Sequence, residues 1–203
     1  MLSDFKKTID GGLLKMNLCE RCGSTEATVR YTGEVKEETL CLDCFNKIIS
    51  TDLGVELEEQ PLTVSIPDNQ GVMRNFNIEK MILPNGIFLE AKEDISYGYT
   101  FSVHGELDED QHLLFQKLIH KVKHRISKQY LNHEVSPITN QEQISMVEHE
   151  VVGTIDSDEN NEDVPLLIID GRPYEWNEFG KILTINEGCQ FQLKVLDFTE
   201  DIE

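Results

Sequence analysis

LCERC at residues 18–22 and LCLDC at residues 40–44 decide how this chain begins its fold, because each stretch contains two cysteines separated by two residues. This spacing lets both sulfur atoms of a tight turn face one metal ion, and a second pair completes a tetrahedral set of thiolates. We therefore predict that Cys19, Cys22, Cys41 and Cys44 bind one Zn²⁺ ion. Because four protein ligands leave no position for water or substrate, the predicted zinc is structural.

The residues around these cysteines predict a zinc finger over residues 17–54. Between the pairs, residues 27–40 alternate apolar and polar side chains, which predicts a hairpin that turns near Thr32-Gly33. After the second pair, apolar residues recur at helical spacing as far as Gly54, which is expected to end the helix. The tight turn that carries the first pair, a zinc knuckle, is thus followed by a hairpin and by a helix that carries the second pair. This order of elements predicts a treble-clef-like finger. A zinc ribbon, with the second pair on another knuckle, is the alternative.

A middle domain over residues 60–131 is predicted to combine an antiparallel β-sheet with one long helix. The runs rich in β-forming residues are 62–66, 76–83, 87–91 and 99–103. Asp108 and Gln111 have the spacing of a capping box, and apolar residues from Leu114 to Tyr130 then form one helical stripe.

The segment 132–164 is predicted to be an acidic linker. Lys and Arg are absent between Lys128 and Arg172, and residues 156–163 are too polar to bury one face. A short helix over residues 141–151 is an alternative within this segment.

A small module is predicted over residues 165–198, built from a β-hairpin, a helix and a strand. The hairpin turns at Asp170-Gly171, and alternating apolar residues predict a final strand over residues 191–195. Trp176 on the helix is expected in the core, with an interface anchor as the alternative. Residues 1–16 are expected to form a flexible lead-in and residues 199–203 an acidic tail. The predicted fold class is therefore α+β, with an N-terminal finger, a middle domain and this small module.

Charge and hydropathy limit the classes of partner. The formal net charge of −20 argues against binding nucleic acid over most of the surface, because Lys and Arg supply most of the affinity for phosphates. Apolar runs are far shorter than the roughly 18–20 residues that span a bilayer, and the first residues lack a basic-then-apolar signal pattern. We therefore expect a soluble cytoplasmic protein without a membrane partner. Paired cysteines suit this reducing compartment, and Cys189 is expected to be buried.

Two segments resemble known families. Residues 17–50 resemble the four-cysteine zinc module of bacterial protein-arginine-kinase activators, on the residue ranges 18–23, 27–33 and 40–44. That resemblance implies a metal-binding unit that docks on other proteins. Residues 166–198 resemble a small C-terminal module of bacterial zinc-finger proteins of unknown function, through Ile169-Asp170-Gly171, Trp176 and Glu178-Phe179-Gly180. The second resemblance implies no activity.

Three functions follow from these features. The first is a non-enzymatic adaptor that docks on a protein partner, whose identity and the chain's own oligomeric state stay open. The second is a nucleic-acid-linked regulator that uses the finger and the basic face of the long helix. That face bears Lys117, Lys121, Lys123, Arg125 and Lys128. The third is an enzyme with its site in the middle domain. His120 and His124 have the spacing of a second metal site, although surface histidines are the simpler interpretation.

Overall fold

A computed structural model describes residues 17–33, 36–137, 140, 142–158 and 161–200. The predicted lead-in over residues 1–16 lies outside the described residues. The chain divides into two compact units, one up to Gly54 and one from Val55 onward. Helices and antiparallel sheets are both present, so the predicted α+β class is confirmed at this level.

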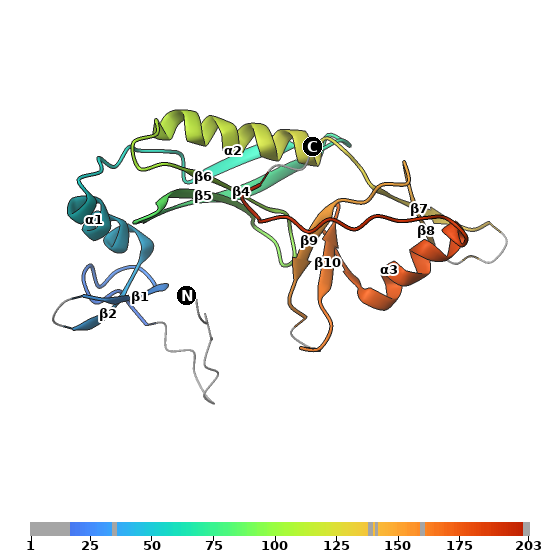
Figure 1. Cartoon of the computed structure of the whole chain (residues 1–203), viewed down its shortest axis with the longest axis horizontal. Coiled ribbons are helices and arrows are strands. Elements are labelled where there is room, and N and C mark those ends of the chain that lie inside the picture. Colours follow the sequence, from blue (N-terminus) through green and yellow to red (C-terminus); the bar gives the residue numbers. More distant parts are fainter. Residues whose placement is uncertain (1–16, 34–35, 138–139, 141, 159–160, 201–203) are drawn as a thin grey trace. The chain divides into compact units, whose positions relative to one another are not determined.

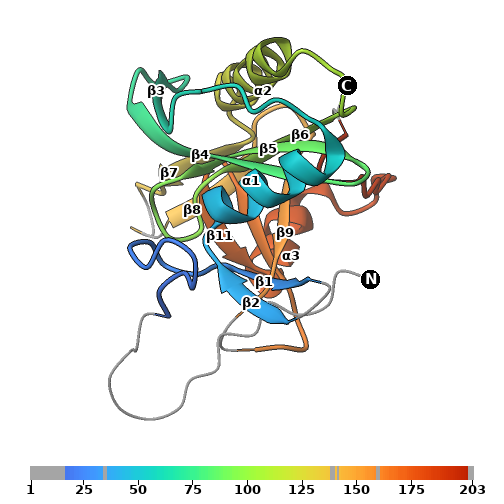
Figure 2. The ribbon, with the colours of Figure 1, turned by 90° about the vertical axis from the view of Figure 1, so that its left-hand side faces the viewer.

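The first unit contains a hairpin followed at once by a helix (Figure 2). Strands β1 (Val29–Thr32) and β2 (Glu37–Leu40) pair antiparallel, and helix α1 spans Leu42–Leu53. Gly54 ends α1 at a φ of 69°, in the left-handed region that glycine adopts without strain. The hairpin and the helix end were both predicted correctly.

A four-stranded sheet covered by one helix opens the second unit (Figure 1). Its strands are β3 (Thr63–Pro67), β4 (Met73–Leu83), β5 (Gly86–Glu93) and β6 (Thr100–Gly105), in the spatial order β3-β4-β5-β6. Helix α2 (Gln111–Ile126) packs on β5 and β6. Its apolar stripe is fully buried, as the sequence predicted, at Leu114, Leu118, Val122 and Ile126. No helix among the described residues is both long and apolar enough to cross a membrane.

The cap of α2 differs from the prediction. Asp110, rather than Asp108, is the N-cap, and its carboxylate accepts hydrogen bonds from the backbone N–H groups of His112 and Leu113. The neighbouring acids in this stretch make the position of the cap ambiguous in the sequence. Asp110 has an extended backbone and directly precedes the first helical residue, so its carboxylate reaches the free N–H groups of the first turn.

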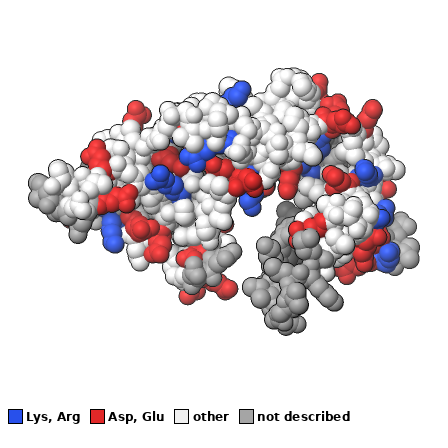
Figure 3. All heavy atoms as spheres, turned by 180° about the vertical axis from the view of Figure 1, so that it is seen from behind, with Lys and Arg blue, Asp and Glu red and all other residues white. Residues whose placement is uncertain are grey.

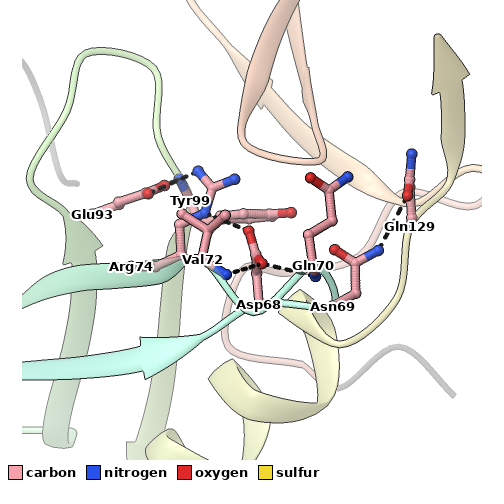
Figure 4. A network of polar contacts seen from close by, with 8 residues as sticks. All are labelled: Asp68, Asn69, Gln70, Val72, Arg74, Glu93, Tyr99 and Gln129. Carbon is pink, nitrogen blue, oxygen red and sulfur yellow. Dashed lines mark hydrogen bonds and ion pairs between the residues drawn. The ribbon is translucent and has the colours of Figure 1, made fainter. Parts of the chain in front are cut away.

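An ionic network closes the β3–β4 turn (Figure 4). Asp68 accepts hydrogen bonds from the N–H groups of Gln70 and Val72, and it pairs with Arg74 at 2.9 Å. Arg74 also pairs with Glu93 at 3.1 Å, and both carboxylate side chains are buried. The network therefore joins the turn to the end of β5.

The predicted linker and helix between residues 132 and 164 are wrong, because this segment contains three strands. Strands β7 (Leu131–Val135) and β8 (Glu142–Met146) form a two-stranded sheet, and β9 (Gly153–Asp156) pairs with β10 (Leu166–Ile169). Ile144 and Met146 pack against a cluster that includes Tyr130 and Leu131. Apolar contacts to residues distant in sequence thus outweigh the local polarity.

The rest of the module contains the predicted hairpin and helix. Strand β11 (Arg172–Glu175) pairs with β10, and helix α3 (Trp176–Leu183) is followed by the 3₁₀ turn η1 (Thr184–Asn186). The sheet order is β11-β10-β9. The Asp170 carboxylate accepts hydrogen bonds from the N–H groups of Tyr130 and Leu131, at 2.8–3.1 Å. This contact fixes the hairpin turn to the start of β7.

Three expectations for this module are wrong. Trp176 is 50% exposed, and the α3 side chain that is buried in the core is Ile182. Cys189 is exposed rather than buried. Residues 191–195 do not form a strand, since no neighbouring strand among the described residues pairs with them.

Candidate metal centre

The first cysteine pair lies on a tight turn. The N–H of Gly23 donates to the carbonyl of Cys19 at 2.8 Å, and Gly23 adopts a φ of 67°. The N–H of Cys19 donates in turn to the carbonyl of Thr25 at 2.8 Å. Because the chain reverses within these residues, the sulfur atoms of Cys19 and Cys22 face the same point.

The second pair lies at the start of α1. Cys41 is the N-cap residue, and its carbonyl accepts the N–H of Phe45 at 3.0 Å. Cys44 lies in the first helical turn. Free N–H groups and the positive end of the helix dipole act to lower the pKa of thiols at this position, but burial outweighs them and raises the pKa of both Cys41 and Cys44. A helix, and not a second knuckle, therefore presents this pair.

The four sulfur atoms form one cluster, all within 4.8 Å of one another. The distance from Cys22 Sγ to Cys41 Sγ is 3.8 Å. A tetrahedral zinc site with Zn–S bonds of about 2.3 Å places neighbouring sulfurs about 3.8 Å apart. The donor set and this spacing fit a metal ion, and the sequence prediction that these four side chains converge is confirmed.

The acidities of the four thiols are unequal. Hydrogen bonds from the side chain and backbone of Ser24 lower the pKa of Cys22 to about 5. Burial raises the pKa of Cys44 to about 12, and burial also raises that of Cys41. For Cys19, burial alone would raise the pKa, but backbone hydrogen bonds from Cys22 and Cys41 outweigh this effect, so the pKa is lowered. Binding a metal to all four sulfurs therefore releases protons.

Contacts between the knuckle and β2 hold the two cysteine pairs together. The N–H of Glu20 donates to the carbonyl of Thr39 at 3.0 Å, and the Glu20 carboxylate accepts the N–H of Thr39 at 2.9 Å. Arg21 pairs with Glu38 at 3.0 Å. Sequence reasoning missed these supporting residues, because their roles depend on the hairpin register that places β2 beside the knuckle.

Other candidate residues lie apart from this cluster. His120 and His124 are exposed on α2 with parallel rings whose centroids are 6.5 Å apart. His104 Nε2 lies 2.9 Å from the carbonyl oxygen of Asn85. Lys121, expected on the basic helix face, donates to the carbonyls of Ser102, Thr199 and Glu200. Within the described residues, the cysteines are the one group of three or more potential metal ligands that converge.

Three protein-family models match successive parts of the chain. Residues 18–56 match a domain of unknown function (DUF7685), residues 58–127 match another (DUF7686), and residues 130–200 match a third (DUF7713). No curated protein and no solved structure matches the chain. None of the three descriptions names an arginine-kinase activator, so that resemblance stays a prediction. Along residues 18–200 the chain is thus similar to three consecutive domain families of unknown function.

Proposed function

We propose that the first unit is a treble-clef-like finger that binds one structural Zn²⁺ ion, and that the protein is a non-enzymatic adaptor. The sulfur cluster carries the first part of this proposal. Four cysteines supply a closed ligand set, and the pair on the helix start matches a treble clef better than a ribbon. Because close thiols form disulfides under oxidising conditions, a reducing compartment such as the cytoplasm fits this role.

Substitution of one ligand tests the zinc assignment. Cys41→Ser is expected to reduce bound zinc from one ion per chain to near zero, as measured by metal analysis of purified protein. Cys189→Ser is the matched control, because Cys189 is exposed and lies outside the cluster. Retention of one zinc ion by the Cys41 variant, or loss of zinc from both variants, would contradict the assignment.

An exposed aromatic side chain on α3 supports the adaptor role. Trp176 is 50% exposed, and its ring lies against that of Phe179 at a centroid distance of 6.3 Å. Leu183 and Ile185 are also exposed further along the same segment. Tryptophan is enriched among residues that dominate the binding energy of interfaces, so this face is suited to docking.

The charge around Trp176 indicates the chemistry of the partner. Glu175 and Glu178 lie beside the tryptophan at the start of α3, and both are exposed. Acidic side chains are spread over the visible face in Figure 3, in keeping with the net charge of −20. The complementary partner is therefore a protein with an apolar pocket rimmed by Lys and Arg.

Capture of partners by the intact, zinc-loaded chain tests this role. Trp176→Ala should remove a near-stoichiometric partner, whereas Val72→Ala should retain it. Val72 is a suitable control because it is 52% exposed, close to the 50% of Trp176, and lies in the β3–β4 turn. A partner that both variants retain would move the docking surface elsewhere. Binding of nucleic acid instead would favour the regulator hypothesis.

A further inference from the structure

Residues 190–195 combine the properties of a β-strand with the absence of a strand partner. The sequence Gln190-Phe191-Gln192-Leu193-Lys194-Val195 alternates polar and apolar side chains. Phe191, Leu193 and Val195 are 91%, 74% and 68% exposed. Among the described residues, none of these backbone groups takes part in a strand ladder or a turn hydrogen bond. Such a segment is suited to pairing with the free edge of a sheet.

The same module carries a free edge. Strand β9 is the last strand in the order β11-β10-β9, and its four residues are exposed. Its outward N–H and C=O groups lie along an unpaired edge in the part of the chain that the structure describes. Each copy of this protein therefore carries both an unpaired strand and an unpaired edge.

The apolar surface of this sheet ends at the β9 edge. Tyr174 on β11 lies opposite Leu167 on β10, and Leu167 lies opposite Ile155 on β9. Along this row exposure rises from 4% at Tyr174 to 56% at Ile155, with Leu167 partly buried between them. An added strand whose apolar face carries Leu193 would continue the row and cover Ile155.

Charge also matches the strand to the edge. Residues 189–195 contain Lys194 and no acidic residue. Strand β9 ends at Asp156, and residues 157–163 contain four further acids and no Lys or Arg. Lys194 thus supplies a positive charge to an acidic edge.

We propose that residues 190–195 of one copy pair with β9 of a second copy, and that a reciprocal pairing closes a symmetric dimer. A twofold arrangement uses residues 190–195 and the β9 edge of each chain at once, whereas a different protein that paired with one of them would leave the other unpaired. Covering four exposed side chains from each copy, together with the paired backbones, hides on the order of 1,000 Å², about the smallest size of a specific interface. The dimer is independent of the zinc site and of any partner of α3.

The oligomeric state of the full zinc-loaded chain tests the proposal. Analytical ultracentrifugation should show a monomer–dimer equilibrium for the unmodified protein. Leu193→Asp and Ile155→Lys should each weaken dimerisation by at least about tenfold, because they place a charge in the row and on the edge. Leu62→Asp is the matched control, since Leu62 is an exposed leucine outside both elements, and it should leave the equilibrium unchanged.

Mixing the two variants gives a sharper result. A mixed pair keeps one intact contact, between the normal strand of the Ile155→Lys chain and the normal edge of the Leu193→Asp chain. The mixture should therefore dimerise more strongly than either variant alone. Because salt screens both the attraction of Lys194 to the acidic edge and the repulsion between two chains of charge −20, all variants are compared at one fixed ionic strength.

Three results would overturn the proposal. The first is an unmodified chain that is monomeric at all concentrations tested, and the second is a Leu193→Asp chain that dimerises like the unmodified one. The third is slow amide hydrogen exchange of residues 190–195 in the monomer, which would show that the strand pairs with its own chain. Normal Trp176 fluorescence in each variant excludes misfolding as the cause of a weakened dimer.

Discussion

Cys41 combines two structural roles in one residue. It is the N-cap of α1, and its sulfur lies 3.8 Å from that of Cys22 in the cluster. Cysteine is not among the favoured N-cap residues, and its side chain makes no capping hydrogen bond here. The helix start therefore lacks a side-chain cap, and a metal ion bound as proposed by Cys41 and Cys44 would fix it.

At Asp170, one side chain holds two segments that are distant in sequence. Its carboxylate accepts the N–H groups of Tyr130 and Leu131, while its backbone adopts a φ of 53°. Asp170→Ala should destabilise the second unit by about 2–3 kcal/mol, because buried N–H groups lose their acceptor and alanine tolerates this conformation poorly. Urea unfolding followed by Trp176 fluorescence measures the change.

Asp170→Asn is the control for that prediction. Asparagine tolerates positive φ and keeps one acceptor oxygen, so its cost should be clearly smaller than that of alanine. Equal destabilisation by the two substitutions would show that the charge, rather than the hydrogen bonds, holds the turn.

At the scale of single elements, the cap of α2 gives a direct comparison. Asp110→Ala should lower the free energy of unfolding by about 1 kcal/mol, because two N–H groups of the first turn lose their acceptor. Asp108→Ala should change it by less than about 0.5 kcal/mol, since Asp108 is an exposed residue outside the cap. Thermal unfolding of both variants is the measurement, and the reverse order of effects would restore Asp108 as the cap.

The turn between β3 and β4 should make the second unit sensitive to acid. Burial alone would raise the pKa of Asp68, but hydrogen bonds from Arg74, Val72 and Gln70 outweigh it and lower that pKa. Because the folded pKa lies below the unfolded value of about 3.9, ionised Asp68 stabilises the fold above about pH 4. This contribution is lost as the pH falls through the folded pKa.

Asp68→Asn tests this dependence. The variant should be less stable at pH 7 by about 1.5–3 kcal/mol, because a charged acceptor is lost, and its stability should fall less steeply below about pH 4. Trp176 fluorescence follows unfolding of the second unit separately from zinc loss, since it is the only tryptophan in the chain. Parallel acid profiles for the two proteins would rule out Asp68 as the titrating group.

The elements differ in how far the sequence predicts them. Strands β4 and β5 and helix α2 carry long periodic patterns, because each buries one continuous face. Strands β7 to β9 are only four or five residues long and mostly exposed, and β9 pairs with β10 across an acidic loop. Their stability depends on partners distant in sequence, which local polarity conceals.

The metal site was predictable because its signal is chemical. Two cysteine pairs at knuckle spacing limit the ligands to four residues, whatever the surrounding fold. The bonds between Glu20 and Thr39 were not predictable, since they require the register of a hairpin. Exposure of Trp176 was missed because the apolar residues of α3 cover more of the helix surface than the core does: Phe179 and Ile182 pack on the core, whereas Trp176 does not.

At the scale of the whole molecule, the two units should respond differently to loss of metal. Among its described residues, the first unit buries few large apolar side chains, chiefly Leu40 and Phe45, whereas the second contains the main core. Removing zinc with a chelator should make residues 17–54 sensitive to protease, because metal binding supplies much of the folding energy of small modules. A fragment that begins near Val55 should persist, as identified by mass spectrometry.

Simultaneous loss of both units would contradict this independence. Cys189→Ser again serves as a control, since it leaves all four ligands in place and should give the same digestion pattern as the unmodified chain.

The C-terminal segment is held at both ends. Before it, the N–H of Cys189 donates to the carbonyl of Asn186, and after it the Lys121 ammonium donates to the carbonyls of Thr199 and Glu200. The stretch between these anchors therefore loses less conformational entropy on docking than a free chain end would. The Ser102 hydroxyl also donates to the carbonyl of Phe198 at 3.0 Å, so removal of residues 198–200 would take away the whole second anchor. The proposed dimer would then bind less tightly, because residues 190–195 would lose more conformational entropy on pairing. The side chains in the interface would all be unchanged.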